Sequence, residues 1–235
     1  LNTLVAAGYA SRDPQTRLFV IGPRIPQLHR AFLARSRASP TTLPFLHALH
    51  QATGETVHLV RLFGEDAVTV ELIAGQEPLA AGVGYVGVAM PAHVSAAGRA
   101  LLAWLPAERL CAYIAGRYGH FAGPFPAADG ARLEAEAAQI RNKGHAIDCG
   151  TAHPDMWCVA APIITAAREA DEALAIVTSR SRFARDGSAL IAAVTAIADA
   201  AGKVAAIDLA AGATAEPDFS QDATEAVKRA IEVPL

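Results

Sequence analysis

The spacing of apolar residues along the chain predicts several helices. Leu190, Val194 and Ile197 recur at three- and four-residue intervals, which is typical of a helix with one apolar stripe. Gly54 and Gly144 follow two other periodic segments and are expected to end helices there. The expected helices lie at 1–7, 26–37, 42–53, 95–105, 107–115, 129–143, 187–206 and 221–231.

Alternation between apolar and polar residues predicts strands. Val68, Val70 and Leu72 alternate with Thr69 and Glu71, so one face of this strand is expected to be buried. Because helices and strands do not alternate regularly, the pattern favours an α+β fold with a largely antiparallel sheet. The expected strands lie at 56–63 and 67–73, joined as a hairpin, and at 145–148, 157–164 and 173–179, with a loop and a short strand at 78–90.

Composition narrows the class of protein. The chain has 235 residues, of which 52% are hydrophobic, so it can bury a sizeable core and is not mainly disordered. A net charge of -3 excludes a basic surface over the whole chain but leaves room for a local basic patch. Three cysteines are too few for a disulfide framework and indicate a reducing, cytoplasmic compartment. No stretch is interpreted as long and apolar enough to span a bilayer, and no signal peptide is visible, so we expect no membrane contact.

The first residues suggest one small unit. Gly8 is placed to end a short helix, and the turn residues Asp13 and Pro14 separate two strand-like segments. Arg12 and Arg17 flank this turn, where they either contact DNA phosphates and the minor groove or are simply solvated side chains. Since the chain begins inside an expected helix, we expect it to be a fragment of a longer protein.

The segment after Pro91 contains a candidate anion site. Small residues follow Ser95 at the expected helix start, which leaves the backbone amides of Ala96 and Ala97 free to meet an anion. The alternative is a tight contact between helix and sheet that needs small side chains. His93 is either a ligand contact or a core histidine.

A mixed group of His, Cys and Asp residues offers an alternative chemistry. His145, Cys149, His153 and Cys158 suggest a metal-binding sensor or enzyme, although their spacing matches no standard zinc knuckle. Alternatively, Asp148 and Cys158 place a carboxylate and a thiol beside the helix that follows Ser95. No nucleophile elbow, P-loop, dinucleotide fingerprint, H-E-x-x-H or C-x-x-C motif is present, so we expect no enzymatic activity and no cofactor.

Four segments, in this order, make the chain resemble the IclR-type bacterial transcriptional regulators. Residues 1–23 resemble the end of the family's recognition helix and its wing, and 53–59 resemble the entry to its effector domain. The most recognisable signature is at 93–103, and 158–163 followed by 175–179 resembles a second one. The resemblance implies a truncated winged helix-turn-helix at 1–22, a linker helix at 23–40, a GAF-like effector domain with a largely antiparallel sheet at 41–211, and a polar tail at 212–235.

The same resemblance implies a function. Such regulators are homodimers or homotetramers that bind a palindromic double-stranded operator and respond to a small metabolite, often a carboxylic acid. Val177 stands where some relatives carry a hydroxyl, and Ala96 replaces a glycine, so the effector's identity is not transferable. A GAF-like interaction module with a vestigial pocket is a further alternative. The implied effector-binding residues are Leu79, Met90, Ala96, Ala97, Asp148, Cys158 and Ser179.

Overall fold

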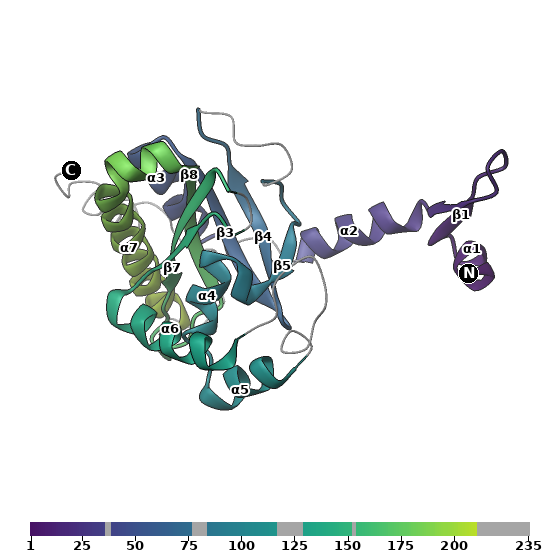
Figure 1. The fold of residues 1–235 in the computed structure, drawn as a ribbon. Coiled ribbons are helices and arrows are strands. Elements are labelled where there is room, and N and C mark those ends of the chain that lie inside the picture. The colour runs from purple at the N-terminus through teal and green to yellow at the C-terminus, as the bar shows by residue number, and fades with distance from the viewer. Residues whose placement is uncertain (36–38, 77–83, 117–128, 152–153, 211–235) are drawn as a thin grey trace. The chain divides into compact units, whose positions relative to one another are not determined.

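The chain folds into two units that are described separately. The computed structural model describes residues 1–35, 39–76, 84–116, 129–151 and 154–210 (Figure 1). One unit comprises residues 1–37 and the other residues 38–235. The expected last helix at 221–231 lies outside the described residues.

The first unit contains the helix and hairpin expected from the sequence. Gly8 has φ +77°, a left-handed conformation that glycine adopts without steric cost, and it follows the short helix. The Asp13 carboxylate accepts hydrogen bonds from the amides of Gln15 and Thr16, which stabilises the hairpin turn. The elements are α1 (Asn2–Ala6), β1 (Ala10–Arg12), β2 (Phe19–Ile21) and α2 (Arg24–Arg35), with β1 and β2 antiparallel.

The second unit is built on a six-stranded sheet. Every described pairing in it is antiparallel, and the strand order is β5-β4-β3-β8-β7-β6. This confirms the expected α+β fold with an antiparallel sheet. The strands are β3 (Thr56–Phe63), β4 (Asp66–Ile73), β5 (Ala89–Pro91), β6 (Ala146–Cys149), β7 (Met156–Ile163) and β8 (Glu172–Ser179).

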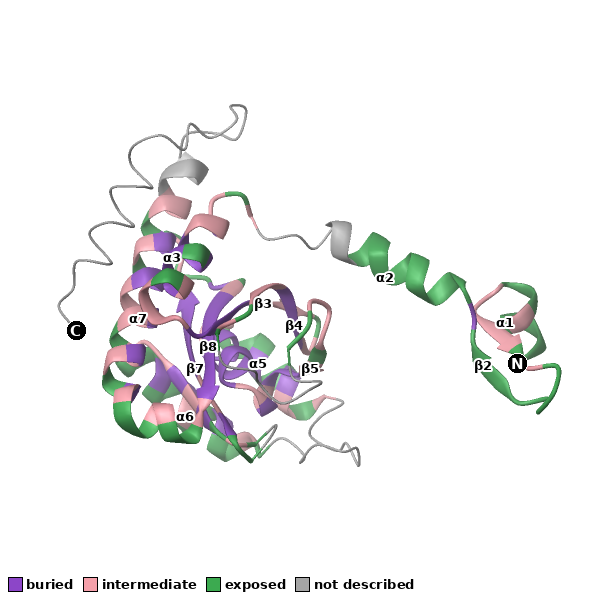
Figure 2. Cartoon of the chain, turned by 90° about the horizontal axis from the view of Figure 1, so that it is seen from above, coloured by how far each residue is buried: buried purple, intermediate pink, exposed green. Residues whose placement is uncertain are grey.

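Helices cover both faces of this sheet. Two helices pack on one face, and a short 3-10 helix with three further helices lies on the other (Figure 1). Figure 2 shows the resulting burial of the central strands. The helices are α3 (Leu43–Thr53) and α7 (Arg180–Ala210) on the first face, and η1 (Ala92–Val94), α4 (Ala96–Leu102), α5 (Ala107–Ala115) and α6 (Gly130–Lys143) on the second.

Coverage of both faces changes the interpretation of β4. The sequence alternation predicts one buried face, but Thr69 is buried together with its neighbours Val68 and Val70. The reason is that Val70 faces the cluster under α3 and α7, whereas Thr69 faces the side of the sheet that α4 covers. The polar residue Thr69 in this alternation therefore lies on a second buried face of the sheet and not on a face exposed to solvent.

Helix α7 also differs from expectation. It begins at Arg180, not at 187, and runs through Gly187, whose added Cβ would lie 3.0 Å from the Phe183 ring. Residues Arg180–Ala206 are long and apolar enough by composition to cross a membrane, so the expectation that no such stretch exists is wrong. The helix packs against β7 and β8, as a core helix of a folded domain does.

Candidate ligand-binding site

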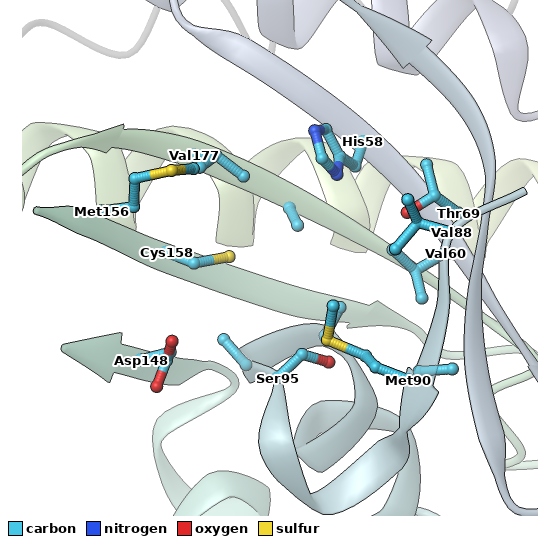
Figure 3. A pocket seen from close by; sticks show the side chains of 14 residues that line it. His58, Val60, Thr69, Val88, Met90, Ser95, Asp148, Met156, Cys158 and Val177 are labelled. Carbon is cyan, nitrogen blue, oxygen red and sulfur yellow. The ribbon is translucent and has the colours of Figure 1, made fainter. Parts of the chain in front are cut away.

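A cavity lies between the sheet and the start of α4 (Figure 3). Its volume is about 70 Å³, and most of its wall is apolar. Strands β3, β4, β6, β7 and β8 contribute residues, together with the segment from 88 to 97. The lining residues are His58, Val60, Ala67, Thr69, Val88, Met90, Ser95, Ala96, Ala97, Asp148, Met156, Cys158, Ala175 and Val177.

The start of α4 is held close to the preceding segment. A Cβ added to Gly98 would lie 2.1 Å from the carbonyl oxygen of Ala92, so only glycine allows this approach. Ser95 caps the helix, because its Oγ accepts a hydrogen bond from the Gly98 amide at 3.0 Å. The bonds described for this part of the chain give the amides of Ala96 and Ala97 no partner. Both residues line the cavity, as the sequence predicts.

Asp148 is buried at one end of the cavity with a counter-charge. It is 4% exposed, and its Oδ1 lies 3.8 Å from Nη2 of Arg99 and accepts a bond from the Thr151 amide at 3.3 Å. The Arg99 guanidinium also donates to the carbonyls of Val94 and Ile147. This arginine therefore ties α4 to η1 and β6 and offsets the Asp148 charge.

Arg99 is a residue that the sequence reasoning missed. Its Nε lies 2.8 Å from Oε1 of Glu136 on α6, without the alignment of a hydrogen bond. Arg99 itself is 9% exposed. An arginine among the apolar and small residues of 96–103 was the available signal, since arginine is rarely buried unless it is paired.

Cys158 is a neutral thiol at the same end. Asp148 and Cys158 are direct partners across β6 and β7, so strand pairing brings the two predicted residues together. Burial, with a smaller contribution from the Asp148 charge, raises the pKa of Cys158 to about 12. The side chain thus offers a thiol hydrogen rather than a negative charge to a ligand.

His58 is a cavity residue that the sequence analysis did not select as a site. It is buried at 7% exposure, and the structure describes no hydrogen bond for its Nε2 atom. Burial lowers its pKa to about 4, so the imidazole is neutral near pH 7. The missed signal was the alternation along β3. His58 and Val60 are two residues apart and so share the face of the sheet that points away from the α3 and α7 cluster.

The remaining predicted site residues lie in different places. Met90 lines the cavity, whereas Leu79 lies outside the described residues. Ser179 is not among the described lining residues; its Oγ lies 3.1 Å from Oγ of Ser181 and accepts a bond from the Arg182 amide, at the start of α7. His93 does not line the cavity either, and its Nδ1 lies 2.7 Å from the Tyr113 hydroxyl.

The residues of the metal alternative are not brought together where the structure describes them. No group of three or more His, Cys, Asp or Glu residues in the described ranges could hold a metal ion. Cys149 is exposed, and the His145 ring lies at the surface with Nδ1 3.0 Å from the Lys143 carbonyl. His153 lies outside the described residues.

The two predicted DNA-contacting arginines, Arg12 and Arg17, are both exposed on the hairpin of the first unit. Nε of Arg12 donates to the carbonyl of Arg17 at 3.2 Å, and the Arg12 guanidinium lies 5.7 Å from the centre of the Phe19 ring. Arg17 has φ +57°, a left-handed conformation that residues other than glycine adopt uncommonly and mostly in turns. The hairpin thus holds both side chains near its tip, where they are accessible.

Comparison with known proteins decides the family. The model of the IclR C-terminal domain of bacterial transcriptional regulators matches residues 32–205. The chain belongs to the IclR family of transcriptional regulators. The solved structure of the IclR protein of Thermotoga maritima has the same fold, with a TM-score of 0.64 at 20% identity over 88% of this chain and 82% of that one.

Two curated relatives agree with this assignment. The chain is 29% identical over 185 residues to the HTH-type transcriptional regulator XynR of Escherichia coli, covering 77% of this chain and 72% of XynR. It is 32% identical over 179 residues to the HTH-type transcriptional regulator BhcR of Paracoccus denitrificans, covering 75% of this chain and 63% of BhcR. These IclR relatives are named as regulators and not as enzymes, so this family member is a transcriptional regulator.

Proposed function

We propose that the cavity binds a small carboxylic-acid effector and that binding changes the affinity of the full-length regulator for its operator. The observation that carries this proposal is that the amides of Ala96 and Ala97 line an apolar cavity and have no described partner. Amides at a helix start carry positive potential and bind anions. The neutral Cys158 thiol adds a hydrogen-bond donor without repelling the carboxylate.

The charge of Asp148 is compatible with an acidic effector. An unpaired carboxylate beside the site would repel an anion, but the Arg99 guanidinium lies 3.8 Å from Asp148. Because Arg99 also bonds to η1 and to β6, a ligand that shifts Asp148 would shift these segments as well. This gives the effector a physical route from the cavity to the packing of α4.

We propose the remaining organisation from the family membership and the sequence. Arg12 and Arg17 contact operator DNA, and the cytoplasmic protein acts as a homodimer or homotetramer. The proposed domains are the winged-helix remnant at 1–22, the linker helix at 23–40, the effector domain at 41–211 and the tail at 212–235.

The test compares operator binding with and without acid in two variants. Ala97→Leu places a bulky side chain in the cavity, whereas Ala107→Leu adds the same side chain to an exposed position on α5. We expect a panel of small acids to change operator affinity by about 5- to 150-fold in the wild type and in Ala107→Leu, and not in Ala97→Leu. An equal response in both variants would place the effector elsewhere.

A thermal-shift screen separates a working site from a vestigial pocket. An effector present at about 100 times its Kd adds about 2.7 kcal/mol to the free energy of unfolding. A flat response across a broad library of acids would contradict effector binding.

Replacing both Arg12 and Arg17 by alanine should reduce the salt dependence of DNA binding by about two phosphate contacts and leave the acid response unchanged.

A further inference from the structure

The cavity wall opposite the start of α4 carries a polar group that the proposed effector contacts leave unused. Figure 3 shows the His58 ring across the cavity from Asp148 and Ser95. The residue is only 7% exposed, and its Nε2 has no hydrogen-bond partner among the described residues. Because buried ring nitrogens are nearly always hydrogen-bonded, an unpaired one at a cavity wall indicates a partner inside the cavity.

Strand pairing fixes how far His58 lies from the acidic end. Cys158 on β7 pairs with Val177 on β8, which pairs with Thr56 on β3, two residues from His58. Two strand spacings of about 4.8 Å separate the backbones of β7 and β3 by about 10 Å. His58 therefore lies on the wall about two strands from Cys158, with Thr69 of β4 beyond it on one side and Asp148 of β6 beyond Cys158 on the other.

The surroundings of His58 favour an uncharged partner. The lining residues nearest to it in the sheet are Thr69 on β4 and Ala175 and Val177 on β8, none of which is ionisable. The ionisable lining residues Asp148 and Cys158 lie on β6 and β7, two or more strands away from β3. Since burial lowers the pKa of His58 to about 4, a second carboxylate would meet a neutral ring and lose its hydration without a counter-charge.

The size of the cavity limits the ligand. A buried water needs about 10–15 Å³ measured in the same way, so 70 Å³ accommodates on the order of five water-sized groups. This suits a short unbranched acid better than an aromatic one.

We propose that His58 is a specificity-determining residue that hydrogen-bonds through Nε2 to a hydroxyl or carbonyl oxygen at the far end of a short-chain acid. This inference rests on the proposed function, because the carboxylate of that acid is assigned to the amides of Ala96 and Ala97. The effector class is thus a short hydroxy or keto acid with oxygens at both ends, rather than a simple fatty acid or a dicarboxylate.

The test is calorimetric titration of the whole chain with matched acids. The probes are butyrate, 4-hydroxybutyrate and succinate, and the three-carbon set propionate, 3-hydroxypropionate and malonate. We expect the wild type to bind the hydroxy acid of one set about five- to tenfold more tightly than the simple acid and the dicarboxylate of that set. This ratio corresponds to the contribution of about one hydrogen bond. In His58→Leu this preference should fall to about twofold or less, while the affinity for the simple acid stays within about twofold.

Two further variants separate recognition from folding. His58→Gln retains a hydrogen-bonding side chain and should restore part of the preference for the hydroxy acid. His47→Gln changes an exposed histidine on α3, across the sheet from the cavity, and should bind all six probes as the wild type does. Unfolding midpoints of all variants establish that each is folded.

The possible results distinguish the inference from the proposed function. If His58→Leu keeps the preference, or loses affinity for the simple and hydroxy acids equally, the role of His58 is wrong and acid binding stands. The same holds if the wild type binds acids without preference for a hydroxyl. If none of the six acids binds to the wild type, both the proposed function and this inference are overturned.

Discussion

The two faces of the central sheet use the same strands but differ in the size of their side chains. On β8, Leu174 and Ile176 belong to the cluster under α3 and α7, whereas Ala173 and Ala175 belong to the cluster under α4. Large residues of β8 pack into the first interior, whereas on the second face the small side chain of Ala175 borders the cavity. One face therefore stabilises the fold, and the other combines stability with room for a ligand.

The largest expected effect comes from removing a large side chain from the first face. Ile176 is 0% exposed, so Ile176→Ala should reduce the free energy of unfolding by about 2–5 kcal/mol. On the second face, the neighbouring change Ala175→Gly should cost about 1 kcal/mol or less. Urea unfolding measures both, and equal costs at the two positions would contradict the difference between the faces.

A smaller effect is expected from the buried histidine of the second face. Burial lowers the pKa of His58 from 6.5 to about 4, so the unfolded chain binds the proton more readily and stability falls as pH falls between these values. The loss attributable to this residue is at most about 3 kcal/mol. In His58→Leu the stability should therefore fall less between pH 7 and pH 4 than in the wild type.

The control for this pH dependence is a histidine that is exposed. His47→Leu should leave the slope of unfolding free energy against pH as it is in the wild type. Urea unfolding at pH 7, 6, 5 and 4 gives the three slopes. A slope for His58→Leu equal to that of the wild type would show that His58 is not buried in its neutral form.

The smallest effect concerns the tolerance of each face to an added group. Ala161 faces the filled cluster, so Ala161→Val should overpack it and cost about 1–3 kcal/mol. Ala175 borders the cavity, so Ala175→Val should cost less than about 1 kcal/mol while weakening acid binding. If Ala175→Val is the more destabilising of the two, the second face is as tightly filled as the first.

Local sequence signals were sufficient to place most elements. Glycines at 54 and 144 adopt the left-handed conformation that ends α3 and α6, and Asp129, the expected first residue of that helix, is the residue that caps α6. These features depend on a few neighbouring residues, so a single sequence reveals them. Gly187 shows the limit, because the spacing predicts that α7 begins there, whereas the residue lies inside that helix.

The candidate site could be predicted in part. The helix start at Ala96 and Ala97 and the pair Asp148 and Cys158 carry signals within short segments, and all four line the cavity. Ser179 was expected there as well, but its hydroxyl contacts the start of α7. Alternation along β8 gives the face of a residue but not how far along the sheet the cavity extends.

The sequence by itself determined the family, the antiparallel α+β architecture and the helix start beside Ala96 and Ala97, because these follow from local spacing and short motifs. The tertiary structure decided that His58 faces the same cavity as Cys158 and that Arg99 offsets the charge of Asp148. These residues are far apart in the chain and meet through strand pairing and through the docking of α4 on β6 and β7. Such contacts depend on the packing of the whole domain, which no local pattern encodes.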